Sequence, residues 1–411
     1  GWNYYKFHVS DAVANRWADF PNVGVSNNEV YVTVNLFTNS NYFDKVLLYQ
    51  INKQNGYNNQ SLQFTTWTDI TDNQGDPPFT LVPVSYGHQG NYGPGIVLCA
   101  TEDPGSSNKV QIFDLTADLG GGAQLNGYSA SIPSFQIGGN AVQPDDGDEM
   151  DIGDCRMKNA FFLNNTVHCV FTSNYQSGWN GINYSRVELS SMTATNKKFG
   201  AVGRDMGYPA LASFSNNAGD KTVVIGYEES STTINPCFKA VVCDDAMTFG
   251  TAVLLKAGAT FIDVDPGNFE RWGDYLGIHR RFTTSSPTVW VFGIYAKNSS
   301  NGGIYGNNAV ELINTSETAL GSSTKPSADI TVYPNPGELY FTVMLQVAKA
   351  AETRFELYDA SGRLVKHLTT KHLTPGKFQF GFNSDALSAG VYFLRVQTAE
   401  KTIANEKIVI Q

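Results

Sequence analysis

The stretch that decides the fold is Glu29–Phe37, EVYVTVNLF, which alternates along the chain between valine or leucine and other side chains. Val30, Val32, Val34 and Leu36 fall on one face of an extended chain. A period of two residues is typical of a β-strand that presents one face to a core. The same pattern returns many times along the sequence, so we expect an all-β protein.

Similar strands recur in groups of four about every 60 residues between Phe20 and Asn314. The pattern predicts five groups, at residues 20–66, 79–137, 156–202, 208–255 and 275–313. The fifth group is one strand short, and Trp2–Val9 is a β-rich run without a partner. We therefore predict a five-bladed β-propeller in which Trp2–Val9 closes the ring as the missing outer strand. A larger ring that has lost blades from its N-terminal side is the alternative.

The composition points to an extracellular protein. The chain has 411 residues, which exceeds one ordinary domain, with 39 glycines, 45 tyrosines and phenylalanines together, and 16% charged residues. No apolar run is long enough for a membrane helix. The first residues have no basic and apolar leader, so we expect that a signal peptide was removed or that the N-terminus is truncated.

Charge is concentrated in the larger part of the chain. Residues 1–326 carry 19 Lys and Arg against 30 Asp and Glu, whereas residues 327–411 carry 9 against 8. An acidic body repels the phosphate backbone, so a nucleic-acid partner is not expected. The five cysteines have no CxxC spacing, which makes zinc improbable, and we expect mostly free buried thiols with at most one disulfide.

Three aspartates are candidates for chemistry because they lie at or just before strands that would line the propeller channel. Asp19, Asp154 and Asp274 come from different blades and could supply the acid and the base of glycoside cleavage. The other interpretation is that these carboxylates pair with arginines such as Arg156 and Arg271 and hold the ring together.

An acidic loop is a candidate for calcium. Asp145, Asp146 and Asp148 provide carboxylate oxygens within a few residues of one another, although the loop lacks the EF-hand spacing. A solvated loop without metal is the alternative, and no other cofactor is expected.

Three short motifs accompany these candidates, at Asp154–Arg156, Tyr208–Leu211 and Arg271–Tyr275. They resemble motifs of a broad group of secreted bacterial propeller proteins. That group has no single assigned activity, so the resemblance supports the fold more than any reaction.

The end of the chain forms a second predicted domain. Thr315–Pro326 is small, polar and aperiodic, which is typical of a linker. We expect a propeller at 1–314, a linker at 315–326 and a further domain at 327–411. Short β runs with turns between them predict a small antiparallel β-sandwich for this last domain.

Four motifs in the last domain carry a more specific signal. They are Tyr333-Pro334-Asn335-Pro336, the turn with Asp359, Gly362 and Arg363, the turn with Gly390 and Tyr392, and the terminal KIVI that begins at Lys407. In order and spacing they resemble the type A C-terminal sorting domain of type IX secretion substrates. An ordinary accessory sandwich, such as a carbohydrate-binding or fibronectin-like module, is the alternative.

The resemblance implies a route and partners. It implies a bacterium of the Bacteroidetes type, recognition by the outer-membrane translocon and its shuttle protein, and removal of the domain by a sorting peptidase. The body would reach the cell surface or the medium. We expect it to act there as a binding or adhesion module for a glycan or a surface partner, and the alternative is a secreted glycoside hydrolase.

Overall fold

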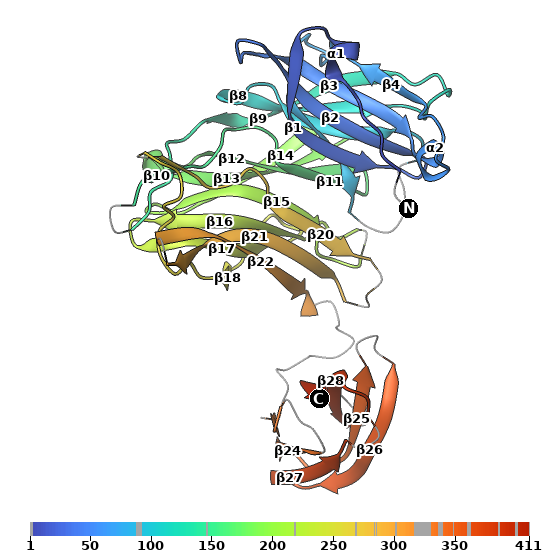
Figure 1. Ribbon diagram of the computed structural model, residues 1–411, viewed down its shortest axis with the longest axis vertical. Helices are drawn as coiled ribbons and strands as arrows, with labels where there is room; N and C mark the ends of the chain where they lie inside the picture. Colours follow the sequence, from blue (N-terminus) through green and yellow to red (C-terminus); the bar gives the residue numbers. More distant parts are fainter. Residues whose placement is uncertain are drawn as a thin grey trace. The chain divides into compact units, whose positions relative to one another are not determined.

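The protein is all-β in this computed structural model, in which antiparallel sheets make up most of both units (Figure 1). The structure describes residues 3–87, 93–144, 147–217, 219–267, 269–282, 284, 286–300, 302–315, 330–335, 340–347, 349–359, 363–384, 387–398 and 402–410. None of the helices among them is long and apolar enough to span a membrane. The chain divides into two compact units, Gly1–Glu317 and Thr318–Gln411.

The first unit begins with two four-stranded sheets whose strands pair in chain order. The first sheet contains β1 (Arg16–Val25), β2 (Glu29–Thr38), β3 (Phe43–Asn52) and β4 (Phe64–Trp67). The second contains β5 (Phe79–Pro83), β7 (Ile96–Thr101), β8 (Ser106–Leu115) and β9 (Leu125–Gln136). A short helix, α2 (Lys53–Tyr57), lies between β3 and β4.

Three more sheets follow. The third contains β11 (Asn159–Leu163), β12 (Thr166–Asn174), β13 (Asn180–Glu188) and β14 (Thr193–Phe199), and β6 (Ser85–Tyr86) joins its β11 edge in parallel. The fourth contains β15 (Asp205–Ser213), β16 (Val223–Ser231), β17 (Ile234–Cys243) and β18 (Val253–Lys256). The fifth contains β20 (Gly277–Arg281), β21 (Thr288–Ser299) and β22 (Gly302–Ile313). Two short strands, β10 (Glu149–Asp151) and β19 (Phe269–Arg271), pair in parallel outside these sheets.

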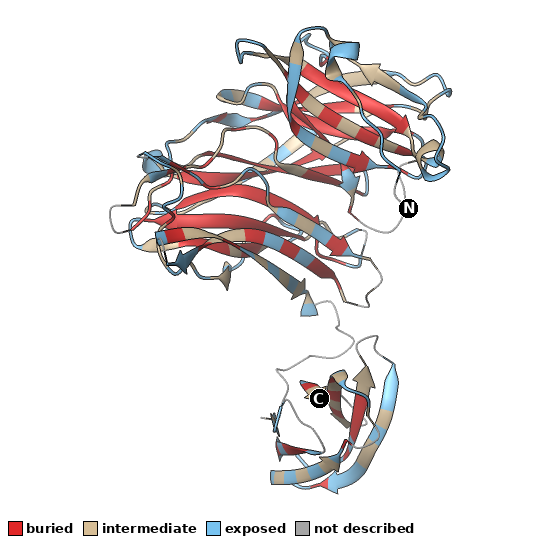
Figure 2. Cartoon of the chain, viewed as in Figure 1, coloured by how far each residue is buried: buried red, intermediate tan, exposed pale blue. Residues whose placement is uncertain are grey.

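Each sheet packs on the next, so inner strands of the three middle sheets, such as β7, β12 and β16, are buried on both faces (Figure 2). Leu48 of the first sheet and Leu98 of the second belong to one core, and Phe238 of the fourth and Val291 of the fifth belong to another. A strand with two covered faces has no polar side to alternate with. This explains why β7 is buried along its whole length.

The prediction for the start of the chain is wrong. Residues 3–8 are not a strand, α1 (Val9–Ala12) follows them, and in the described residues the fifth sheet has only its own three strands. The N-terminal segment instead packs on the valine face of β2, which holds Val30, Val32 and Val34. The opposite face of β2 is the more deeply buried one, against the second sheet. The valine face therefore needs a cover, and the aromatic N-terminal segment supplies it.

The second unit is a small antiparallel sandwich, as the sequence predicted. One sheet contains β23 (Ile330–Tyr333), β24 (Tyr340–Val347) and β27 (Gly376–Asn383). The other contains β25 (Ala351–Asp359), β26 (Leu364–Leu373), β28 (Gly390–Thr398) and β29 (Thr402–Ile410). Phe355 of one sheet lies with its ring centroid 5.0 Å from that of Phe380 in the other, within a shared hydrophobic core.

All five cysteines of the first unit are buried free thiols. Burial raises the pKa of Cys155 and of Cys237 to about 12, so both thiols are protonated at neutral pH. These side chains act as small apolar groups of the cores.

The stacked cores predict a clear difference between two substitutions. Leu98 is fully buried between the first and second sheets, so Leu98→Ala leaves a cavity and should lower the free energy of unfolding of the first unit by about 2–5 kcal/mol. Val23 on β1 is 65% exposed, and Val23→Ala should change it by less than about 0.5 kcal/mol. Urea unfolding of the full chain measures both. Equal effects of the two variants would contradict the packing.

Candidate functional site

The largest cavity described in the first unit, about 860 Å³, brings together loops and strand starts from several sheets. Its charged lining consists of Asp19, Asp151, Asp154, Asp274, Arg156, Lys158 and Arg271. Its ring-bearing lining consists of Phe20 and Tyr275. The structure thus places all three aspartates that the sequence proposed as catalytic candidates around one space, which we call the channel mouth.

An unusual backbone on two first strands positions the aromatic side chains of this region. Phe20 on β1 has φ 52° and Tyr208 on β15 has φ 49°, and both lie where the strand pairing shifts register. The left-handed region is rare for bulky residues and costs about 1–2 kcal/mol. A bulge turns a side chain away from the regular ladder. The bulges at these two positions present the rings of Phe20 and Tyr208 to the cations of the channel mouth.

Asp154 is fully engaged by its neighbour Arg156. The Arg156 Nε and Nη2 atoms donate to the two carboxylate oxygens of Asp154, each at 2.7 Å. The guanidinium also lies 4.2 Å from the ring centroid of Phe20 and 5.1 Å from that of Phe79. Arg156 therefore links its own segment to both the first and the second sheet.

Asp274 has the same kind of partner. Arg271 Nη2 donates to both carboxylate oxygens of Asp274 at 2.8 Å, in a pair that is about half exposed. The next residue, Tyr275, stacks on Phe20 with ring centroids 4.7 Å apart. This stack brings the segment before the fifth sheet against the first strand of the first sheet.

Asp19 differs from the other two candidates. Its Oδ1 accepts a hydrogen bond from the backbone N–H of Phe20 at 2.8 Å. Within the described part of the chain, no lysine or arginine forms an ion pair with it. Among the described residues, the arrangement therefore leaves exposed Asp19 and half-buried Asp151 without an arginine, beside two carboxylates that are occupied by arginines.

Lys158 is the third cation of the channel mouth and lies between two rings. Its Nζ is 5.0 Å from the ring centroid of Phe20 and 4.9 Å from that of Tyr208. Burial, followed by the positive charge of Arg156, lowers the pKa of Lys158 to about 8, although nearby aspartates oppose the shift. Rings that face a cation in this way favour its charged form and so offset part of that cost.

Two of the three calcium candidates, Asp145 and Asp146, lie outside the residues that the structure describes. The backbone oxygen of Asp148 accepts a hydrogen bond from the Gln143 side chain at 2.7 Å. Among the described residues, no group of three or more His, Cys, Asp or Glu side chains could hold a metal ion. The calcium site remains a prediction.

The proposed sorting residues of the second unit fasten its strands and turns. The Asn335 amide donates to the backbone oxygen of Lys407 at 2.6 Å and accepts from the N–H of Val409 at 2.9 Å, which holds β29 next to the end of β23. Tyr333 ends β23, the bond between it and Pro334 is cis, and Pro336 lies outside the described residues.

The two turn motifs also have structural roles. The Asp359 carboxylate accepts from the backbone N–H and the Nε of Arg363 at 3.0 and 3.1 Å, across a turn whose Gly362 is outside the described residues. Gly390 begins β28, and the Tyr392 hydroxyl donates to the backbone oxygen of Ser388 at 2.8 Å. The motif residues thus shape the sandwich.

The comparison with family models decides what this sandwich is. Residues 331–411 match the model described as a secretion system C-terminal sorting domain. These residues are the sorting domain of a type IX secretion substrate. The sorting domain implies interaction with the type IX machinery and export of the chain across the outer membrane to the cell surface or the extracellular space.

The remaining comparisons are much weaker than the sorting-domain match. The GH32 β-fructofuranosidase BmSUC1 of Bombyx mori has a TM-score of 0.31 at 9% identity, covering 96% of this chain and 86% of its own. A GH43 arabinoxylan arabinofuranohydrolase from Bacillus subtilis has 0.29 at 9%, covering 97% and 96%. Dimeric latent PorU from Porphyromonas gingivalis has 0.19 at 12%, covering 86% and 35%. No curated protein sequence matches the chain. Such TM-scores assign no chemistry to the channel mouth.

Sequence reasoning missed the rings and the lysine that complete the channel mouth. The sequence pattern assigns Phe20 to a strand and Tyr275 to a strand and to the Arg271–Tyr275 motif, and it indicates no role for Lys158. Phenylalanine rarely adopts a left-handed backbone, so the residue type at position 20 does not indicate the conformation that the structure has there.

The lowered pKa of Lys158 predicts an unusual dependence of stability on pH. The unfolded lysine keeps its proton up to about pH 10.4, so at pH 7 folding must bury a charged amine. Between about pH 8 and 10 the folded protein releases that proton, and this cost disappears. Lys158→Met should therefore raise the free energy of unfolding by about 1–2 kcal/mol at pH 7, with little gain at pH 10.

Urea unfolding at the two pH values measures this difference. Lys197 on β14 is exposed and forms no ion pair among the described residues, so Lys197→Met is the matched control and should have little effect at either pH. A Lys158→Met protein that is less stable than the wild type at pH 7 would show that the ring contacts outweigh the burial of charge.

Proposed function

We propose that the first unit is a five-bladed ring whose channel mouth binds a glycan outside the cell, without cleaving it. The five sheets pack one on the next in chain order. The stack of Phe20 on Tyr275 supports closure, because it joins the first sheet to the segment that leads into the fifth. In this proposal side-chain contacts, in place of an N-terminal strand, complete the ring.

The occupied carboxylates favour binding over cleavage. Glycoside hydrolysis needs two carboxyl groups free to act on either side of the scissile bond. Asp154 and Asp274 each direct both oxygens to an arginine. Asp19 and Asp151 have no such partner among the described residues, and only Asp19 of these two is exposed. A site with fixed carboxylates next to an exposed ring is suited to a ligand that is rich in hydroxyl groups. The hydroxyls of such a ligand can donate to the carboxylates, and its apolar face can pack on the aromatic side chain.

The partially exposed ring of Tyr275 gives the test of this binding site. Tyr275→Ala removes a ring that is 49% exposed and lines the channel mouth, so affinity for the glycan should fall about tenfold or more. Tyr42→Ala is the control, since Tyr42 is 73% exposed and is not among the residues lining the channel mouth.

A printed glycan array identifies the ligand, and titration calorimetry with the full chain then measures both variants. Equal affinities of the Tyr275→Ala and Tyr42→Ala proteins would place glycan binding away from the channel mouth.

The second candidate function is glycoside hydrolysis. Four aspartates line one cavity, which is the observation in its favour. This candidate requires either that Asp151 act together with Asp19 or that an arginine leave Asp154 or Asp274 when the substrate enters. Hydrolysis predicts that the glycan is cleaved over time, whereas the binding function predicts that the glycan stays bound and intact.

We propose that the outer-membrane translocon and its shuttle protein bind the sorting domain, and that a sorting peptidase cuts within Thr315–Pro326. Most of that segment lies outside the described residues. It falls close to the boundary between the two compact units, where a protease would spare both cores.

Removal of the sorting domain tests this route. A chain that ends at Pro326 should fold its first unit but stay in the periplasm of a type IX-competent bacterium, because it lacks the domain that the machinery recognises. Fractionation and immunoblotting measure its location. The full chain in a strain without the translocon is the control and should be retained in the same way. Secretion of the shortened chain would contradict the proposal.

A further inference from the structure

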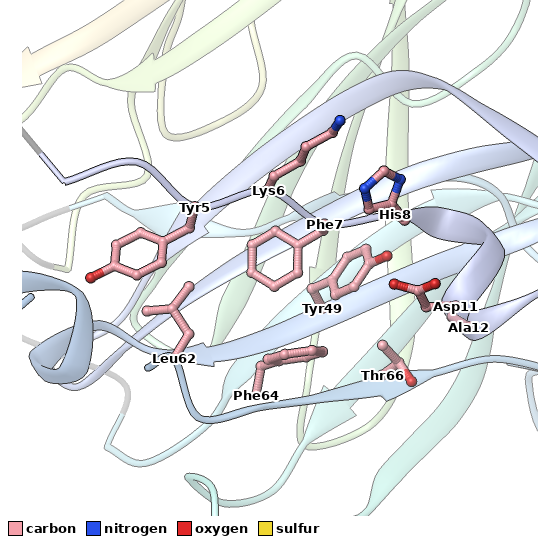
Figure 3. Close-up of a pocket in the computed structure, with 10 residues that line it drawn as sticks. All are labelled: Tyr5, Lys6, Phe7, His8, Asp11, Ala12, Tyr49, Leu62, Phe64 and Thr66. Carbon is pink, nitrogen blue, oxygen red and sulfur yellow. The ribbon is translucent and has the colours of Figure 1, made fainter. Parts of the chain in front are cut away.

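A second cavity of the first unit, about 360 Å³, lies on the face of the first sheet that turns away from the second sheet, between the N-terminal segment and strands β3 and β4 (Figure 3). It shares no lining residue with the channel mouth. Its volume falls within the range of small-molecule sites, about 300–1,000 Å³.

The wall of this cavity is held in place by specific contacts. The Asn3 amide and the Tyr5 hydroxyl both donate to the backbone oxygen of Gly56, at 3.0 and 3.3 Å. The ring centroid of Phe7 lies 5.0 Å from those of Tyr49 and Phe64. The N-terminal segment is therefore docked on the sheet, and the space beside it is a formed cavity.

The two ends of the cavity differ in character. Figure 3 shows the ring of Tyr5 and the side chain of Leu62 toward one end, Asp11 and His8 toward the other, and the ring of Phe7 between them. An aromatic and aliphatic end next to a polar end matches a ligand with one apolar face and a rim of hydroxyl groups.

A buried hydroxyl at the polar end provides an independent sign of a ligand. Tyr49 is only 5% exposed, and its hydroxyl has no hydrogen-bond partner among the described residues. Burial, with a smaller contribution from the charge of Asp11, raises the pKa of Tyr49, so the hydroxyl keeps its proton. An unsatisfied buried donor is costly, and a ligand oxygen that accepts from it would remove that cost.

We propose that this cavity binds one pyranose ring of a neutral glycan. The C–H face of the sugar would lie on the exposed ring of Phe64, and its hydroxyls would accept from Tyr49 and donate to Asp11. Asp11 beside the hydroxyl disfavours an anionic sugar at this end. The assignment does not rest on the ligand of the channel mouth. Two separate sugar sites on one exported chain would give avidity for long polysaccharides.

Tyr49→Phe tests the proposal with the smallest possible change. It removes only the unpartnered hydroxyl, so the fold should be kept and the melting temperature should not fall. Cellohexaose, xylohexaose and chitohexaose are the probes, titrated by calorimetry into the full chain. We expect at least one to bind, and Tyr49→Phe and Asp11→Asn each to weaken it by about fivefold to tenfold.

Tyr275→Ala, at the channel mouth, is the control and separates the two sites. Binding of a probe that Tyr275→Ala leaves intact and Tyr49→Phe weakens supports the second site, even if the channel mouth binds nothing. Binding that is lost only in Tyr275→Ala, or the absence of binding by all three probes, would overturn the proposal. If Tyr49→Phe weakens the binding of an aromatic peptide to the same degree and leaves the binding of the three sugars unchanged, the proposal is wrong and the cavity is assigned to a protein partner.

Discussion

The contact on which the first unit depends most is the placement of two cations on the ring of Phe20. Arg156 lies 4.2 Å and Lys158 5.0 Å from its centroid, and Tyr275 stacks on the same ring. One aromatic side chain thereby connects the first sheet to the segment before the third and to the segment before the fifth. Phe20 reaches this position through a left-handed bulge in β1. The strained backbone there is therefore what places the ring on which the channel mouth is assembled.

The same arrangement is the reason that we propose ligand binding, in place of cleavage, at the channel mouth. Arg156 binds Asp154 through two nitrogens, and Arg271 binds both oxygens of Asp274 through one. Ion pairs beside the half-exposed ring of Tyr275 can select a ligand without a change in protonation. The sorting domain is organised differently, since its motif residues, such as Asn335, form the hydrogen bonds that hold the last strand. Its motifs can be recognised in the sequence because their residues form the hydrogen bonds that the fold of this domain requires.

The fold could be predicted further than the site. Alternating residues located most strands of the five sheets to within a few residues, although β22 begins at Gly302, seven residues before the predicted start, and the motifs of the last domain identified the sorting signal. Trp2–Val9 was misplaced, because a β-rich run does not reveal which apolar face it will cover. Asp19, Asp154 and Asp274 line one cavity, and their role in chemistry stays a prediction, whereas the position of the Phe20 ring depends on a backbone conformation that residue type does not encode.

The measurement that tests the central claim most directly follows the fate of a bound polysaccharide. The full chain is incubated with the glycan that it retains on an array, and new reducing ends are counted over time while the bound fraction is measured. If the channel mouth is a binding site, the glycan stays bound and reducing ends do not increase above the protein-free control. A steady release of reducing ends that Asp19→Asn abolishes would contradict the account and identify the protein as a glycoside hydrolase.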